Sequence, residues 1–292
     1  MSTEAAPNLD HLRDWIGRSE TIEERATPQP IHGLYALLDK PTVPKEGDIV
    51  PPMAHWCFFQ PRVPASQIGP DGHPKRGGFM PPVPLPRRMF GGARTTYLKP
   101  LHIGEMMRRT SKIADVQIKS GRTGTLVICT VDNDFEGESG LAMTEQWDIV
   151  YRDNPPADAK DTRGNSGRTN PAPTDHEWVR EIRPDPVMLF RYSAITFNGH
   201  RIHYDRTYVT EVEGYPGLIV HGPLTATFLQ ELARDENPGR TLAGYSFQAR
   251  APLFDTAPFK VAGKPGGDGR TVELWSITPE GTLGTLATAT FA

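Results

Sequence analysis

Apolar and polar residues follow the same order in the two halves of the chain. In each half, a segment with apolar residues at helical spacing precedes several runs in which apolar and polar residues alternate, as in half-buried strands. In the first half we predict a helix over 30–38 and strands over 54–59, 94–97, 106–119, 125–132 and 142–151. In the second half we predict a helix over 223–234 and strands over 243–249, 259–262, 271–277 and 285–291. This order predicts an α+β fold, with one helix against a curved antiparallel sheet in each half.

The segment between the halves differs from both of them in composition. It is rich in proline, glycine and charged residues and has almost nothing to bury, so we interpret 151–183 as a flexible linker between domains 1–150 and 184–292. A similar turn occurs on each side of it, Gly121-Arg122-Thr123 in the first half and Gly269-Arg270-Thr271 in the second. These observations favour an internal duplication, and a chance match of short turn motifs is the alternative.

The composition is that of a globular protein with one large or two modest domains. The chain has 292 residues, of which 37% are hydrophobic, and a formal net charge of −3. Its lysines and arginines are scattered, which argues against a nucleic-acid-binding surface, and no apolar stretch is long enough to span a bilayer. The two cysteines, Cys57 and Cys129, lie far apart, and the first residues carry neither a basic nor an apolar export segment. We therefore expect a cytoplasmic protein.

Residues that can transfer protons are concentrated in one stretch of the second half. Asn198, His200, His203 and His221 fall within it, beside strongly apolar sequence. A histidine buried next to a polar partner is readily tuned into an acid–base catalyst. The alternative for His203 is a buried histidine bonded to a backbone carbonyl, and for Asn198 an ordinary turn residue.

The helix predicted after this stretch begins near Gly222. Pro223 suits the first helical position, and apolar residues follow as one stripe at 224, 228, 229 and 232. The N–H groups of a first helical turn have no partners within the helix, and Gly222 has no side chain to keep a ligand away. The start of this helix therefore predicts an oxyanion site that polarises a carbonyl group.

Two other kinds of site are not favoured by the sequence. His200, His203 and His221 could supply three nitrogens to zinc, but nothing resembles the helical His-Glu-x-x-His arrangement, so we predict no metal. The glycine-rich stretch 263–269 lacks the Lys-Ser/Thr ending of a phosphate-binding loop, which indicates a turn between strands. The proline- and glycine-rich loop 61–86 either covers a cleft or is disordered.

The segment from Asn198-Gly199-His200 to His203-Tyr204-Asp205, followed by His221-Gly222-Pro223-Leu224, resembles the hydratase signature of the MaoC-like hot dog family. Its Thr-Phe-Asn-x-His-x-Ile-His form over 196–203 is similar to the double hot dog branch that includes mesaconyl-C4-CoA hydratase and the fungal-type mitochondrial 3-hydroxyacyl-thioester dehydratase. Residues 85–92 and 99–104 also resemble that branch, so the resemblance covers most of the chain.

The resemblance implies two fused hot dog units, each a curved antiparallel sheet around a helix, with catalysis in the carboxy-terminal unit. It implies reversible addition of water to the double bond of an enoyl-CoA. Asn198 stands where the common signature has aspartate, and an amide can orient water but cannot take its proton. We therefore expect His203 to act as acid and base, Asn198 to position water and the Gly222 amide to polarise the thioester carbonyl. His200 and His221 are secondary candidates. His200 could be a second acid or could set the tautomer of His203, and the alternative for His221 is a structural role beside the start of the helix.

Arginines are the expected contacts for the anionic parts of such a substrate. Arg191 and Arg250 are candidates for the CoA phosphates, with an ordinary surface position as the alternative for each. Arg87, Arg88 and Arg94 are candidates for a carboxylate on the acyl group, as in a mesaconyl- or itaconyl-CoA. We expect no cofactor beyond the substrate's own CoA, and a homodimer, because hot dog units commonly pair.

Two other functions remain open on the sequence. Hot dog folds also include thioesterases, which would release free thiol from a saturated acyl-CoA. The missing signature aspartate is also compatible with a module that binds acyl-CoA without turning it over.

Overall fold

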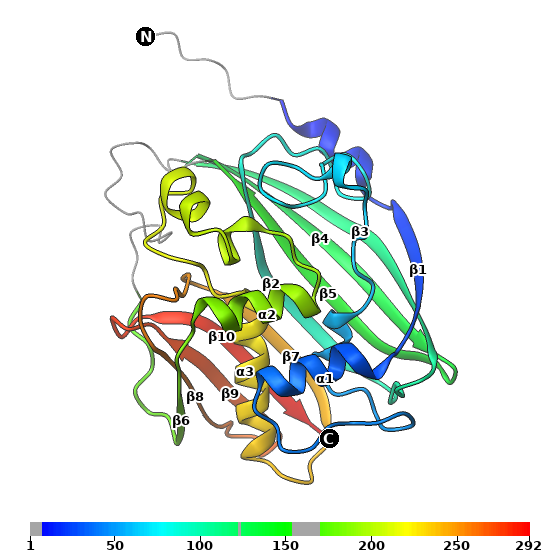
Figure 1. Cartoon of the computed structure of the whole chain (residues 1–292), viewed down its shortest axis with the longest axis vertical. Helices are drawn as coiled ribbons and strands as arrows, with labels where there is room; N and C mark the ends of the chain where they lie inside the picture. Colours follow the sequence, from blue (N-terminus) through cyan, green and yellow to red (C-terminus); the bar gives the residue numbers. More distant parts are fainter. Residues whose placement is uncertain (1–7, 122–123, 154–169) are drawn as a thin grey trace.

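The computed structural model describes residues 8–121, 124–153 and 170–292, and Figure 1 shows the arrangement of their elements. The strands are β1 (Ser19–Arg25), β2 (Arg87–Tyr97), β3 (Met106–Gly121), β4 (Gly124–Gly137), β5 (Gly140–Arg152), β6 (Trp178–Ile182), β7 (Leu242–Ala249), β8 (Phe259–Pro265), β9 (Thr271–Ile277) and β10 (Leu283–Phe291). The α-helices are α1 (Pro28–Leu37), α2 (Pro186–Ile195) and α3 (Gly222–Asp235). The shorter helices are η1 (Asp10–Trp15), η2 (Ala54–Cys57), η3 (Ala65–Gln67), η4 (Arg201–His203) and η5 (Tyr208–Val212).

The strands form one antiparallel sheet in the order β1-β3-β4-β5-β2-β7-β10-β9-β8-β6. Each half contributes five strands in the same internal order, because β6, β8, β9, β10 and β7 repeat the sequence β1, β3, β4, β5 and β2. The halves join where β2 pairs with β7, with Gly92 opposite Gln248 and Thr96 opposite Gly244. This shared order is what an internal duplication produces.

Helix α3 lies within the curve of the sheet (Figure 1). Its apolar stripe is buried as the spacing predicts, and so are the polar residues Thr225, Thr227, Gln230 and Glu231 on its other faces. A helix enclosed on nearly all sides is fixed in position by packing rather than by its own helical propensity. Its first turn, and any ligand bound there, is therefore held rigidly.

Helices α1 and α2 occupy equivalent places after the first strand of each half. They cross closely at Gly33, where an added Cβ would lie 2.6 Å from the Ile195 side chain. Helix α2 begins with Asp185, whose side chain accepts a hydrogen bond from the Met188 N–H, and with Pro186 in its first turn. The contact between Gly33 on α1 and Ile195 on α2 brings the two halves of the molecule together on the same side of the sheet as α3 (Figure 1).

Two predictions from the pattern of residues require correction. The strand predicted over 54–59 is instead the 3-10 helix η2, and the adjacent residues His55 and Trp56 both direct their side chains to Glu145. Successive side chains in a strand point to opposite faces, so a strand could not make both contacts. The linker predicted over 151–183 includes Trp178–Ile182, which is strand β6 paired with β8. Residues 154–169 of that linker lie outside the described residues.

The two cysteines are both buried and free, in separate parts of the first half. Burial raises the pKa of the Cys57 thiol to about 12, which keeps this residue protonated and unreactive at neutral pH. Among the helices of the described residues, none combines the length and apolar character needed to cross a membrane.

Candidate active site

The chain turns sharply between α2 and α3, and this turn carries Asn198, His200 and His203. Phe197 has a left-handed backbone with φ of 47°, after which the Asn198 side-chain oxygen accepts a hydrogen bond from the His200 N–H at 3.0 Å. The short helix η4 follows, and Asp205 closes the turn by accepting from the Tyr208 N–H at 3.0 Å. The oxygen of Asn198 therefore serves the turn itself, as the alternative interpretation of this residue proposed.

His203 is held in one orientation by a single backbone bond. Its Nδ1 lies 2.7 Å from the Ile219 carbonyl oxygen, and a carbonyl can only accept, so Nδ1 carries the proton. The unprotonated nitrogen of the neutral ring is then Nε2. Desolvation by burial lowers the pKa of His203 to about 4. His203 is therefore a neutral imidazole at pH 7, with a defined lone pair available as a base.

His221 stacks on His203 with ring centroids 3.7 Å apart and 18° between the planes. Its Nε2 lies 2.9 Å from the Ser193 hydroxyl on α2, while its buried Nδ1 has no hydrogen-bond partner among the described residues. Desolvation lowers its pKa well below the usual histidine value, and the neighbouring histidines contribute in the same direction. Because His221 also caps the start of α3, one residue links His203 to the first turn of that helix.

The ring of His200 meets the ring of His203 edge to face at 5.5 Å, so the two make no ring-to-ring hydrogen bond. The prediction that His200 could set the tautomer of His203 is therefore wrong, since the Ile219 carbonyl does so. The closest ring to His200 is that of His73, 4.3 Å away. Desolvation lowers the pKa of both His200 and His73 well below the usual value.

His73 was not among the residues that the sequence singled out, because it lies on the 61–86 loop of the other half. This loop docks onto the catalytic turn: the Arg201 N–H donates to the Asp71 carbonyl at 2.9 Å. Gly72 sits at the contact with φ of +89°, and an added Cβ would be 1.8 Å from the Gly199 carbonyl oxygen. Of the two interpretations of the loop, the structure shows the one in which it covers a cleft.

Gly222 lies at the first turn of α3, as predicted, and faces the β2 strand of the amino-terminal half. The nearest atom to a Cβ built on Gly222 is the Phe90 carbonyl oxygen, 4.0 Å away, just before the irregularity in the pairing of β2 with β5 at Gly91. Among the described residues, no side-chain atom lies within 4 Å of that Cβ position, so no side chain covers Gly222 there. A carbonyl group can approach the unpaired N–H groups there.

Phe90 belongs to a cluster of four aromatic side chains. Phe90 lies 5.0 Å from Trp56, 6.2 Å from Trp147 and 5.9 Å from Phe247, measured between ring centroids. Trp56, Phe90 and Trp147 each retain partial exposure although their neighbours are core residues. Rings of this kind, beside the start of α3, can line the space for an acyl group.

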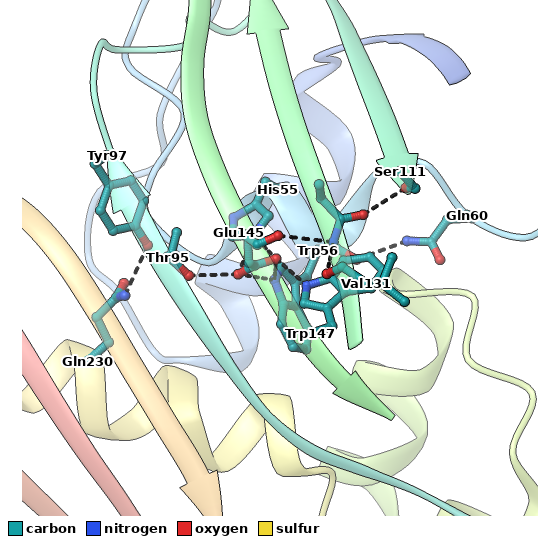
Figure 2. Close-up of polar contacts among 11 residues, drawn as sticks. His55, Trp56, Gln60, Thr95, Tyr97, Ser111, Val131, Glu145, Trp147 and Gln230 are labelled. Atoms are coloured by element: carbon teal, nitrogen blue, oxygen red, sulfur yellow. Dashed lines mark hydrogen bonds and ion pairs between the residues drawn. The ribbon is translucent and has the colours of Figure 1, made fainter. Parts of the chain in front are cut away.

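The aromatic cluster is anchored by a buried carboxylate, Glu145 on β5 (Figure 2). Glu145 accepts hydrogen bonds from the Thr95 hydroxyl at 2.7 Å and from the indole N–H groups of Trp56 and Trp147. Its oxygens also lie 3.2 and 3.3 Å from Nε2 of His55. Burial alone would raise the pKa of Glu145, but its contacts with His55 and with the other donors lower it. The carboxylate is therefore ionised and fixes both tryptophans.

A cavity of about 520 Å³ lies beside His73. It is lined by His73, by the start of β2 and by the region around η5. Arg87 and Arg88, two of the arginines suggested for a substrate carboxylate, line it. Arg94, the third, points elsewhere and pairs with Asp148 at 2.7 Å on the exposed side of the sheet.

Arg191 and Arg250, the expected contacts for the CoA phosphates, are both exposed. Neither lines the 520 Å³ cavity, so their role stays a prediction. As for metals, no group of three or more histidine, cysteine, aspartate or glutamate residues within the described part of the chain could hold an ion.

Solved structures similar to this one define its fold. HtdX of Mycobacterium tuberculosis superposes with a TM-score of 0.65 over 94% of this chain and 100% of its own, at 18% identity. A second protein of the same organism, described as having a double hot dog fold, gives a TM-score of 0.56 over 95% and 96% of the two chains, at 10% identity. The fold is therefore a double hot dog, as the resemblance implied.

The sequence comparisons identify the family. The model of hydroxyacyl-thioester dehydratase type 2 matches residues 53–255. Mesaconyl-C(4)-CoA hydratase of Chloroflexus aurantiacus is 44% identical over 282 residues, which is 94% of this chain and 95% of that protein. The mitochondrial hydroxyacyl-thioester dehydratase type 2 of Schizosaccharomyces pombe is 26% identical over 235 residues, 72% of this chain and 76% of that one.

This chain belongs to the hydroxyacyl-thioester dehydratase type 2 family. It is a MaoC-like enzyme of the hydratase and dehydratase type, a hydro-lyase. The resemblance seen in the signature over 196–203 is thereby confirmed.

Proposed function

We propose that this protein reversibly adds water to the double bond of a short enoyl-CoA that carries a carboxylate or a branch, such as a mesaconyl- or itaconyl-CoA. The observation that carries the proposal is the bond between His203 Nδ1 and the Ile219 carbonyl. It leaves Nε2 of a buried, neutral imidazole as the basic nitrogen, which is what activation of water requires.

In this proposal His203 performs both proton transfers. Its Nε2 takes a proton from water as the water oxygen bonds to the β carbon, and the π electrons of the double bond move toward the thioester carbonyl. The same nitrogen then returns the proton to the α carbon, so the atoms of one water molecule are added and no other reactant is consumed. The reverse order of steps gives dehydration.

The first turn of α3 stabilises the negative charge that develops on the thioester oxygen. Gly222 is open on the side facing Phe90, and the N–H groups of this turn have no partners within the helix. His221 connects this turn to His203 by stacking, which supports one substrate reaching both. In this arrangement the Asn198 oxygen holds the turn through the His200 N–H, and its amide nitrogen is the group left to orient water.

The acyl group is proposed from two observations. The curated relative at 44% identity is a mesaconyl-C4-CoA hydratase, whose name specifies a short, branched dicarboxylic thioester. The aromatic cluster around Phe90 occupies the interior next to Gly222, which favours a short acyl chain over a long one.

The test is the loss of enoyl-thioester absorbance with crotonyl-, mesaconyl- and itaconyl-CoA, measured together with thiol release. We expect absorbance to fall without thiol release, and His203→Ala to lower kcat/KM by roughly a hundredfold or more. His11→Gln is the matched control, because His11 is exposed and distant in sequence from the site. Thiol release from saturated esters would instead indicate a thioesterase. Binding without turnover, unchanged by His203→Ala, would indicate a binding module.

A further inference from the structure

The 520 Å³ cavity beside the histidines has a cationic lining. Its walls carry the four cationic side chains of Lys75, Arg76, Arg87 and Arg88 and the carboxylates of Asp71 and Glu213. His73, whose ring contacts His200, also lines the cavity. A cavity with this balance of charge attracts anions, and it reaches the site through His73, whose ring lies 4.3 Å from that of His200.

Two of the four cations are used by the loop itself. Arg76 donates to the backbone carbonyls of Val83, Leu85 and Pro86, which fixes the end of the 61–86 loop. Lys75 donates to the Ser66 carbonyl at 2.8 Å. These bonds give both residues a structural role.

Arg87 is also engaged. Its guanidinium donates to the Tyr215 hydroxyl at 2.9 Å and to the Glu213 backbone carbonyl at 2.8 Å. It also lies 3.9 Å from the Glu213 carboxylate. Arg87 therefore ties β2 to the region that follows η5, on the far wall of the cavity.

Arg88 differs from its neighbours. Within the described chain its side chain makes neither a hydrogen bond nor an ion pair, and its guanidinium carbon lies 5.9 Å from the centre of the Tyr151 ring. Its nitrogens are not among the enclosed polar atoms that lack a partner, so they remain accessible from the cavity. A guanidinium has five N–H donors in a fork that matches an oxyanion.

The position of Arg88 relative to the histidines indicates what the anion belongs to. After desolvation, its positive charge is a further cause that lowers the pKa of His73 and of His200, so the guanidinium is near enough to both rings to disfavour their protonation. His200 in turn contacts His203. An anionic group held by Arg88 would therefore lie on the His73 side of the site, from which ring contacts lead through His200 to His203.

We propose that Arg88 binds an oxyanion of the thioester substrate in this cavity and thereby helps to select that substrate. The inference rests on the proposed function and extends it to a named specificity residue. Two groups of the substrate have this chemistry, the free carboxylate of a dicarboxylic acyl group and the phosphates of CoA. The carboxylate is the expected source, because in a mesaconyl thioester it lies close to the double bond, whereas the phosphates are at the far end of the pantetheine arm.

The test compares Arg88→Met, Arg88→Lys and wild type with three substrates: mesaconyl-CoA, crotonyl-CoA and crotonyl-pantetheine. We expect Arg88→Met to raise KM for mesaconyl-CoA by roughly ten- to a hundredfold, the value of one charge-assisted hydrogen bond or a bidentate pair. Arg88→Lys should recover part of the loss, because it restores the charge but not the fork. Arg94→Met is the matched control, an arginine of the same strand that lies outside the cavity.

The outcomes separate the sources and the two proposals. A change for mesaconyl-CoA alone assigns the carboxylate to Arg88. A change for both CoA esters but not for crotonyl-pantetheine still supports an oxyanion site and assigns it to the phosphates. Equal KM values for Arg88→Met and wild type with every substrate would overturn the inference. Hydration of crotonyl-CoA by wild type reports on the proposed function independently, so failure of one is not mistaken for failure of the other.

Discussion

The rings of His203 and His221 lie in parallel contact, 3.7 Å apart, and each is fixed from a different direction. His203 is bonded to the Ile219 carbonyl and His221 to the Ser193 hydroxyl on α2. A charged His203 would repel a charged His221, which adds to the effect of burial in keeping His221 neutral. His203 is kept neutral by its own burial and is oriented by the Ile219 carbonyl, and the stack places His221 flat against it.

If His221 acts only by stacking on His203, a phenylalanine ring at this position should preserve most of the activity. We expect His221→Phe to keep kcat within about tenfold of wild type, and His221→Ala to lower it further, since a cavity beside His203 lets the ring move. Steady-state kinetics with the best substrate of the panel measures both. Equal, large losses in the two variants would show that a nitrogen of His221 is needed instead of its shape.

Four histidines of the site, three of them buried and one half-buried, make stability depend on pH. The pKa values of His73, His200, His203 and His221 are all lowered, whereas in the unfolded chain they return to about 6.5. Between pH 6.5 and the folded values the unfolded chain binds more protons, so stability falls as the pH falls. For His203 this window extends down to about 4.

Urea unfolding between pH 7 and 5 tests this dependence. Each such histidine contributes a slope of up to about 1.4 kcal/mol per pH unit in the free energy of unfolding. His203→Gln should make the slope shallower, whereas the exposed control His11→Gln should leave it unchanged. A wild-type stability that is flat over this range would contradict the assignment of neutral, buried histidines.

Glu145 should be important for stability because it is a buried charge that satisfies several donors. Glu145→Gln replaces one carboxylate oxygen by an N–H₂ group, which would face other hydrogen-bond donors. We therefore expect the free energy of unfolding to fall by about 3 kcal/mol or more. Thermal and urea unfolding measure it. Glu138→Gln on the exposed turn after β4 is the matched control and should change stability by less than about 0.5 kcal/mol. Similar stabilities of the two variants would show that the network around Glu145 contributes little.

The aromatic cluster predicts a limit on acyl length. Phe90→Ala removes the ring of the residue whose backbone carbonyl faces Gly222, and should raise kcat/KM for octenoyl-CoA relative to crotonyl-CoA by roughly tenfold. Phe190→Ala serves as control, because Phe190 is 62% exposed on α2. An unchanged ratio in Phe90→Ala would mean that the acyl chain follows another path.

Gly72 tests the docking of the 61–86 loop on the catalytic turn. Gly72→Ala places a methyl group against the Gly199 carbonyl and should displace His73 from His200. We expect kcat/KM to fall by roughly tenfold or more. Gly77→Ala is a control in the same loop: its φ is also positive, at +92°, but the nearest atom to its Cβ is at an ordinary 3.6 Å. If the two variants behave alike, backbone strain rather than docking explains the effect.

The sequence was sufficient for features that depend on local pattern. Alternation and helical spacing predicted most of the strands, and α3 begins at Gly222, within one residue of the predicted start. The short strands β1 and β6 were missed: β1 has a single apolar residue, Ile22, β6 is only five residues long, and both lie at an edge of the sheet. Their existence depends on pairing with β3 and β8, which no local pattern records.

The sequence by itself determined the family, the reaction type and the segment that carries His203 and Gly222, because these are encoded in consecutive residues. Only the tertiary structure decided that His73, more than a hundred residues earlier in the chain, meets His200, and that the Ile219 carbonyl sets the tautomer of His203. Only the tertiary structure also singled out Arg88 as the anion-binding candidate, because the other cationic side chains of the cavity are hydrogen-bonded to the protein itself. The physical reason is that burial, ring contact and unspent hydrogen-bonding capacity are properties of a residue's surroundings, and the fold creates those surroundings from segments distant in sequence.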